Sequence, residues 1–164
     1  FMDETLPFEK LNFGGSSTSW KEIRLAEVLL NYAEAQNEAN GGPDASVEEA
    51  MFKVRNRAGL PALPTGLNQE EMRERIMHER KVELAFEGHR YWDLRRWKLA
   101  ETVLHNKYFH GMKVTINGDG SKNYEVFEVN TLPKQTFLPK HYLMPIHQAE
   151  IQKNPQLGGN NPGY

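Results

Sequence analysis

Three glutamates recur at every fourth position within residues 79–97, at Glu79, Glu83 and Glu87. Two carboxylates about 5 to 10 Å apart can act as acid and base in the hydrolysis of a glycosidic bond, so this spacing raises the question of catalysis. At about 100° per residue, however, all three share one helix face with the apolar Ile76, which predicts that they are buried. Catalytic carboxylates usually lie on different elements across a cleft, so a structural role is favoured here.

Arginines are the expected partners of these carboxylates, because a buried carboxylate is costly unless it is paired and hydrogen-bonded. Five arginines are near in sequence or within reach across packed helices: Arg55, Arg57, Arg90, Arg95 and Arg96. We expect Glu83 and Glu87 to bind Arg90 and Arg95. Nearby cations favour the charged form of a carboxylate and do not raise its pKa. The segment is therefore predicted to be scaffold, with no catalytic residue.

Metal and cofactor motifs are incomplete in this sequence. His78 and Glu79 begin a zinc-protease motif, but Val82 stands where the second histidine is needed. Residues 117–128 resemble a calcium loop, yet Lys122 replaces the glycine of the sharp turn and the flanks have strand character. No phosphate-binding loop, dinucleotide fingerprint or nucleophile elbow occurs. The sequence therefore predicts no metal site and no cofactor.

Aromatic residues are the candidates for ligand contact, because an apolar ring face stacks on a sugar. Trp92 and Trp97 lie five residues apart beside Leu94, and we expect them in the core. Phe13 and Trp20 flank a Gly/Ser-rich stretch, and loops of this kind often carry function. Phe13 and Trp20 are therefore the predicted ligand-binding residues. A packing role at the start of a helix explains Trp20 equally well.

Composition limits the classes of partner. The 164 residues include 38% hydrophobic and 26% charged residues, with a formal net charge of −2. Nucleic-acid-binding domains are usually strongly basic, so no nucleic-acid partner is expected. The sequence contains no cysteine, which excludes disulfides and thiolate chemistry. No apolar run approaches the roughly 20 residues that a membrane-spanning helix needs.

A first helical hairpin is expected over residues 20–59. Apolar residues in helical spacing begin after Trp20, and Gly41 suits the left-handed residue that ends the first helix. Ser46 followed by Glu49 predicts a capping box at the start of the second helix. The short connection makes the two helices antiparallel.

A second helical hairpin is expected over residues 68–106. Asn68 and Glu71 predict another capping box, and the helix that they begin should stop near Gly88. A further helix should then cover about residues 90–105. Two such hairpins in series are typical of a helical-repeat stack, in which each unit buries its neighbour.

After the helices, the period of the apolar residues changes to two. They alternate with polar residues over Met112–Ile116, and the turn sequence at 117–120 predicts a β-hairpin. The alternation changes phase after Val126, which favours a β-bulge. Residues 107–164 are therefore expected to form a β-hairpin followed by an extended, proline-rich tail.

Five stretches of the sequence resemble a known family. They are residues 24–39, 54–61, 79–97, 142–157 and 161–164. In this order they are similar to the C-terminal part of the SusD/RagB family of outer-membrane nutrient-uptake lipoproteins. His147 departs from the family pattern, which usually has proline there, and leaves the hairpin motifs untouched.

The resemblance implies a fold class. That fold is mainly α, with tetratricopeptide-like helical hairpins, a small β-hairpin and an extended, loop-rich C-terminal tail. It also implies that residues 1–164 form one domain, which begins with a loop at 1–19. This domain is expected to be the C-terminal portion of a longer protein.

The resemblance also implies a function without catalysis. Members bind oligosaccharides, or in some cases peptides, and deliver them to a TonB-dependent, SusC-like transporter. The implied location is the surface of the outer membrane, with membrane contact only through a lipid anchor that is missing from this chain. The helical hairpins by themselves are also compatible with a second function, that of a protein–protein adaptor. The acidic helix face suggests a third function, that of a glycoside hydrolase.

Overall fold

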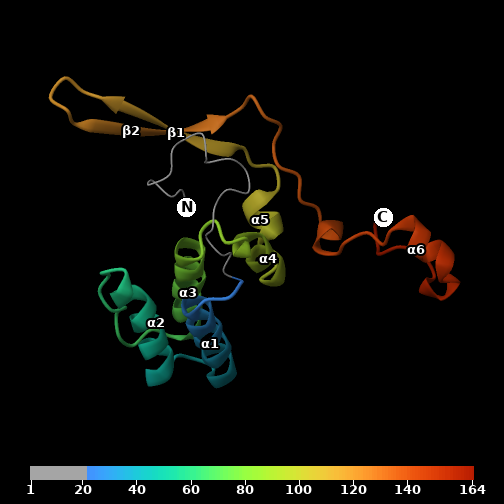
Figure 1. The fold of residues 1–164 in the computed structure, drawn as a ribbon, viewed down its shortest axis with the longest axis horizontal. Coiled ribbons are helices and arrows are strands. Elements are labelled where there is room, and N and C mark those ends of the chain that lie inside the picture. Colours follow the sequence, from blue (N-terminus) through green and yellow to red (C-terminus); the bar gives the residue numbers. More distant parts are fainter. Residues whose placement is uncertain (1–21) are drawn as a thin grey trace, which may run out of the picture. The chain divides into compact units, whose positions relative to one another are not determined.

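A computed structural model describes residues 22–164, which are mainly α-helical (Figure 1). The elements are α1 (Leu25–Asn40), α2 (Ala45–Arg57), α3 (Gln69–Glu83), α4 (His89–Arg96), α5 (Ala100–Leu104), β1 (Phe109–Ile116), β2 (Lys122–Val129), η2 (Pro139–Tyr142), α6 (Gln148–Lys153) and η3 (Pro155–Leu157). The chain divides into two compact units between Ala85 and Phe86. The expected helical hairpin over 68–106 is therefore shared between the units, and the single domain expected over 1–164 stays a prediction.

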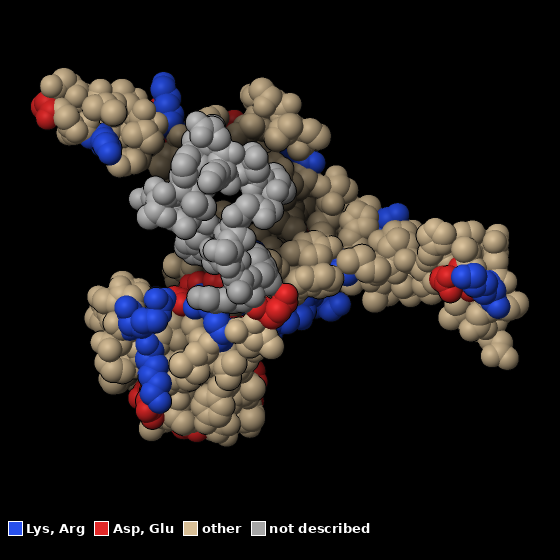
Figure 2. Space-filling model, in the orientation of Figure 1, with Lys and Arg blue, Asp and Glu red and all other residues tan. Residues whose placement is uncertain are grey.

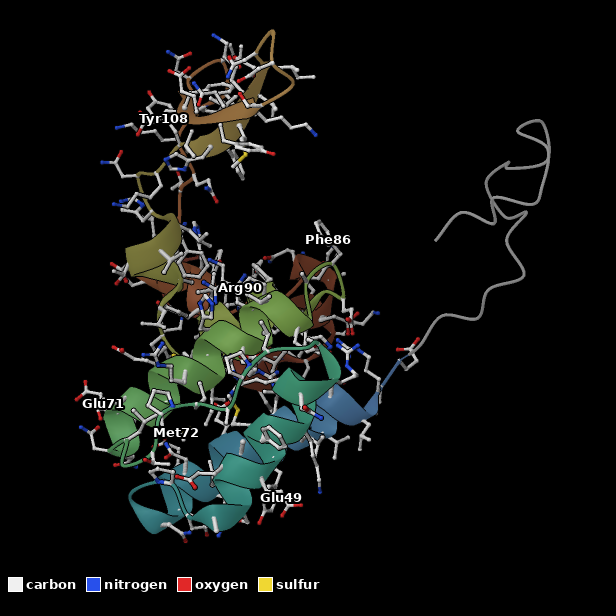
Figure 3. All side chains as sticks on the ribbon, turned by 90° about the vertical axis from the view of Figure 1, so that its left-hand side faces the viewer. Glu49, Glu71, Met72, Phe86, Arg90 and Tyr108 are labelled. Atoms are coloured by element: carbon white, nitrogen blue, oxygen red, sulfur yellow. The ribbon has the colours of Figure 1, made fainter. Side chains whose placement is uncertain are left out.

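The first unit is built from α1, α2 and α3, which lie side by side with α1 packed on both of the others (Figure 1). One hydrophobic cluster joins them through Ala26, Leu30, Ala33, Val47, Ala50, Met51, Val54, Met72, Ile76 and Leu84. Met72 points from α3 into this cluster, whereas its neighbour Glu71 points outward (Figure 3). Apolar residues in helical spacing thus form the buried face of α2, whereas only part of the apolar arc of α1 and of α3 is buried.

Helix α1 begins at Leu25, five residues later than the sequence predicts. It ends where expected, because Gly41 adopts the left-handed conformation with φ of +70° and its amide bonds the carbonyl of Asn37. The face of α1 that carries Leu25, Val28 and Tyr32 remains exposed in the described part of the chain.

Helix α2 is capped by Asp44, so the predicted capping box of Ser46 and Glu49 is wrong. The Asp44 carboxylate accepts hydrogen bonds from the amides of Ser46 and Val47 at 2.9 and 3.0 Å. Glu49 instead pairs with Lys53 one turn further along the helix. Aspartate precedes the first helical residue here and satisfies two amides that have no partner within the helix.

These hydrogen bonds make the start of α2 sensitive to acid. Donation from the Ser46 hydroxyl, the Val47 amide and the Gln36 side chain lowers the pKa of the Asp44 carboxyl from 3.8 to about 2. A carboxyl whose pKa is lowered by folding stabilises the folded state at any pH above its unfolded-state pKa. This stability is lost as the pH falls toward and through its folded-state pKa.

We therefore expect the helical circular dichroism of the protein to show a component that is lost between about pH 4 and pH 2. The Asp44→Asn variant should lack that component, because its side chain does not titrate. The difference between the two acid titrations isolates Asp44 from the other carboxylates. Superimposable titrations of the two proteins would contradict this role for the cap.

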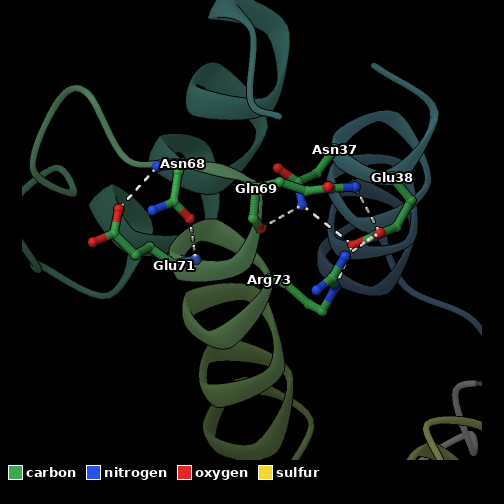
Figure 4. Close-up of polar contacts among 6 residues, drawn as sticks. All are labelled: Asn37, Glu38, Asn68, Gln69, Glu71 and Arg73. Atoms are coloured by element: carbon green, nitrogen blue, oxygen red, sulfur yellow. Dashed lines mark hydrogen bonds and ion pairs between the residues drawn. The ribbon is translucent and has the colours of Figure 1, made fainter. Parts of the chain in front are cut away.

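Helix α3 confirms the predicted capping box. The Glu71 amide donates to the side chain of Asn68 at 3.0 Å, and the Asn68 amide donates to the carboxylate of Glu71 at 2.9 Å (Figure 4). The helix ends at Glu83, earlier than expected, because the next residues form a turn in which Phe86 has φ of +66°. The Phe86 side chain is fully exposed at that turn.

The second unit begins with two short helices in place of the single helix expected over residues 90–105. The break falls at Lys98, which has φ of +58°, between α4 and α5. Leu94, Ala100 and Phe137 form the buried cluster of this unit. Arg95 ties α4 to η2 by donating to the main-chain carbonyls of His141 and Tyr142.

The β-hairpin forms as the sequence predicts, with β1 and β2 antiparallel (Figure 1). The register runs without interruption from the pair Phe109–Val129 to the pair Ile116–Lys122, so the predicted bulge is wrong. Apolar residues of both strands remain exposed in the described structure. Phe127 follows Val126 directly, so its side chain lies on the other face of the hairpin from that of Val126. There the Phe127 ring covers Gly111.

The C-terminal segment is extended and interrupted by α6 and η3. His147 starts α6, because its Nδ1 accepts a hydrogen bond from the amide of Ala149 at 3.2 Å. The Asn160 and Asn161 side chains bind the main chain at Ile146 and Met144. These bonds fix the extended tail although little of it is buried.

Candidate functional site

The acidic face of α3 is turned into the helical unit and is paired with arginine. An oxygen of Glu79 accepts a hydrogen bond from Nη1 of Arg55 at 2.7 Å, and the two side chains are only 7% and 16% exposed. Arg55 also donates from Nε to the carbonyl of Pro61 at 2.8 Å. This second bond holds the guanidinium in place, so the ion pair joins α2 to α3 at a fixed distance.

Glu83 binds two arginines at the end of the same helix. Its Oε1 accepts from Nη1 of Arg24 at 2.6 Å, and both of its oxygens accept from Nη2 of Arg57 at 2.8 Å. Arg24 also donates to the main-chain carbonyl of Glu83. The Glu83 side chain is 8% exposed, and its carboxylate connects the residue before α1, the last turn of α2 and the end of α3.

The expected pairing of Glu83 with Arg90 and Arg95 is wrong. Arg24 and Arg57 occupy its carboxylate, because helix packing brings the start of α1 and the end of α2 to that point. Arg95 instead binds main-chain carbonyls in the second unit. Burial lowers the pKa of the Arg90 guanidinium, and the nearby Asp93 carboxylate opposes part of that change.

A second polar network joins α1 to α3 at the opposite end (Figure 4). Both oxygens of Glu38 accept from the Arg73 guanidinium, and Gln69 adds a hydrogen bond at 3.0 Å. The bond from Arg73 is the main reason that the pKa of Glu38 lies below its ordinary value. The buried Asn37 amide donates to the carbonyl of Gln69 at 3.0 Å. Like the first network, this one connects helices.

The chemistry of these networks is structural. A general acid has to reach substrate, yet Glu79 and Glu83 are enclosed by helices and bound by guanidinium groups. Two cavities of the described residues, of about 440 and 330 Å³, are lined by other side chains. The prediction of arginine-paired glutamates on a buried helix face is confirmed for Glu79 and Glu83. Their partners include the expected Arg55 and Arg57, and also Arg24, whereas Glu87 lies beyond the end of α3.

Within residues 22–164, no group of three or more histidine, aspartate or glutamate side chains is arranged to hold a metal ion. In the stretch that resembles a calcium loop, residues 117–121 form the turn between β1 and β2, and residues 122–128 belong to β2. There Asp119 accepts from the amide and hydroxyl of Ser121 at 2.9 and 2.7 Å, which lowers the pKa of its carboxyl. The Asp119 carboxylate thus stabilises the turn.

The two predicted ligand-binding residues, Phe13 and Trp20, lie outside the residues that the structure describes. Their role stays a prediction. Trp92 and Trp97 are both expected in the core. That expectation is wrong for Trp92, which is 58% exposed, and Trp97 is half-buried. Helix geometry could have indicated this exposure. Trp92 is two positions before the buried Leu94, so it lies about 200° away around the helix, on the opposite side.

An aromatic surface therefore forms on α4, next to the larger cavity. Tyr91 and Trp92 are both exposed, and their ring centroids are 5.1 Å apart with the planes at 75°. The cavity of about 440 Å³ is lined by Tyr91, Leu104, Gln135, Thr136, Phe137 and His141. This part of the second unit combines exposed rings with a concave surface. Sequence reasoning missed it.

Charge is distributed without a dominant sign. On the face shown in Figure 2, acidic and basic side chains are scattered among uncharged ones. Within residues 22–164 no helix has both the length and the apolar character needed to span a bilayer. Neither feature singles out a further site.

Together, the fold and these contacts define a helical protein of the tetratricopeptide-like class whose described carboxylate networks hold helices together. The chain belongs to the SusD family, which it matches over residues 1–164. It is 35% identical to SusD-like protein P2 of Formosa agariphila over 156 residues, which are 91% of this chain and 26% of that protein. It is also 35% identical to SusD-like protein P25 of that organism over 148 residues, covering 87% of this chain and 24% of the relative.

The solved structures that resemble this chain are members of the same family. A SusD-like protein from Bacteroides fragilis superposes with a TM-score of 0.71 at 32% identity, covering 88% of this chain and 26% of that one. A SusD homologue from Bacteroides thetaiotaomicron superposes with a TM-score of 0.64 at 33% identity, covering 88% and 27%. The chain thus spans about a quarter of the length of the curated relatives and solved structures that it matches.

Proposed function

We propose that the protein containing this chain binds oligosaccharides at the outer-membrane surface without transforming them, and delivers them to a TonB-dependent, SusC-like transporter. The observation that carries this proposal is the match to the SusD family along the whole chain. The buried, arginine-bound glutamates of α3 support it, because they leave that helix face with a structural role. The proposed attachment to the membrane is a lipid anchor outside these residues.

Isothermal titration of the full-length protein against a panel of oligosaccharides tests the binding step. We expect heat of binding with at least one uncharged or acidic glycan and no hydrolysis of the bound sugar. Peptides of matched length serve as the control class, because a peptide-binding member of the family responds to those instead. Absence of binding across all the glycans would contradict the proposal.

Affinity purification from outer membranes tests the delivery step. A β-barrel transporter recovered with the full-length protein is the expected result. Recovery of a soluble protein without a transporter would favour a helical-repeat adaptor instead. Release of labelled products from glycans at high protein concentration would favour a hydrolase, and we expect none.

A further inference from the structure

We propose that the surface formed by Tyr91, Trp92 and the adjoining cavity is a subsite for an uncharged sugar residue of the bound glycan. This inference rests on the proposed function and assigns part of the ligand contact to the second unit. The cavity of about 440 Å³ falls within the range of about 300 to 1,000 Å³ that is usual for small-ligand sites.

Exposed aromatic rings supply the stacking surface. The side chains of Tyr91 and Trp92 are 43% and 58% exposed, on a short helix in which Leu94 faces the core. The two rings are nearly perpendicular, with centroids 5.1 Å apart, so their flat faces point in different directions. A sugar has an apolar face of C–H groups, so a ring held in this way offers contact area without requiring a charge.

Arg95 holds the aromatic pair in position. Its guanidinium carbon lies 5.2 Å from the ring centroid of Tyr91 and 5.7 Å from that of Trp92. Nη1 donates to the Tyr91 hydroxyl at 2.8 Å, while the same guanidinium donates to the main-chain carbonyls of His141 and Tyr142. The rings are thus fixed before ligand arrives, which reduces the entropy lost on binding.

Uncharged polar groups line the cavity beside these rings. The main chain of Gln135 pairs with that of Asn106 and Lys107 at 2.8 Å, which positions the Gln135 side-chain amide. In His141, Nδ1 accepts from the Leu138 amide at 3.1 Å, so the neutral ring carries its proton on Nε2 and keeps a donor.

The lining also contains the Thr136 hydroxyl, and no carboxylate, ammonium or guanidinium group lines this cavity in the described structure. Amide, hydroxyl and imidazole groups match the alternating donors and acceptors of sugar hydroxyls. The nearest cation, the Arg95 guanidinium, already donates to the Tyr91 hydroxyl and to two main-chain carbonyls, so it is not directed at an acidic group in the cavity. The geometry therefore points to a neutral sugar residue.

Titration of two variants of the full-length protein tests the subsite. We expect Trp92→Ala and Gln135→Leu each to weaken binding of an uncharged oligosaccharide by about five- to tenfold, as expected for loss of one stacking or hydrogen-bonding contact. Tyr124→Ala is the matched control, because Tyr124 is a similarly exposed aromatic residue on β2, whereas Trp92 packs against Tyr91, which lines the cavity. Thermal melting of each variant verifies that it is folded.

The possible outcomes separate the two proposals. If the unmodified protein binds glycan and both variants bind equally well, the subsite is overturned while the proposed function stands. If the unmodified protein binds no glycan, the proposed function fails, and the subsite with it. A tenfold loss that appears only with a uronic-acid-containing oligosaccharide of the same length would overturn the assignment of a neutral sugar.

Discussion

The Leu30→Ala variant is expected to lose about 2 to 5 kcal/mol of unfolding free energy, the range for truncating a fully buried leucine. Leu30 lies in the middle of α1 with 0% of its surface exposed, and it belongs to the cluster that joins α1, α2 and α3. Truncation removes apolar contacts and leaves a cavity, because closely packed helices relax only in part. Urea unfolding followed by circular dichroism measures the loss.

Val28→Ala provides the matched control on the same helix. Val28 is 49% exposed in the described structure, so its truncation should change the unfolding free energy by no more than about 0.5 kcal/mol. Equal losses for Leu30→Ala and Val28→Ala would show that the exposed face of α1 is covered in the full-length protein. A negligible loss for Leu30→Ala would contradict the packing described for the first unit.

The Glu79→Gln variant is expected to lose about 3 kcal/mol, near the lower end of the range of about 3 to 5 kcal/mol for breaking a buried ion pair. Its partner Arg55 is 16% exposed and is bound on its other side to Pro61, so the guanidinium has little freedom to reach water. Glutamine still accepts one hydrogen bond, which keeps the expected loss at the lower end. Thermal and urea unfolding of the full-length protein measure it.

Glu74→Gln is the control for Glu79→Gln, because it is the same change at an exposed position of α3. We expect it to alter the unfolding free energy by at most about 0.5 kcal/mol. Both variants should bind ligand with unchanged affinity per folded molecule. Normal stability combined with lost binding in Glu79→Gln would overturn the structural role of the acidic helix face and assign it to ligand contact.

Local sequence was sufficient for several features whose determining contacts are local. The Asn68–Glu71 capping box involves residues three apart, and Gly41 ends α1 because glycine tolerates positive φ. The turn between β1 and β2 follows in the same way from its glycine- and asparagine-rich sequence. Each of these features is set by neighbours along the chain.

One error is local, because Asp44 and not the neighbouring Ser46 caps α2. Others concern contacts between distant residues or unusual backbone angles. Arg24 reaches Glu83 from 59 positions away, and no spacing in the sequence indicates that meeting. Lys98 adopts φ of +58°, which side chains other than glycine and asparagine rarely do, so the break between α4 and α5 has no local signal. Sequence proximity therefore favoured the wrong arginines, and helical periodicity merged two helices into one.

The regular pairing of β1 with β2 has a consequence for local opening. No residue of either strand belongs to the two hydrophobic clusters found in the described part of the chain. An isolated two-stranded ribbon is marginally stable in water, so here it can separate and re-form while both helical clusters stay intact. Its amide protons should consequently exchange with solvent sooner than those at the centre of α1, despite eight consecutive residue pairs in register.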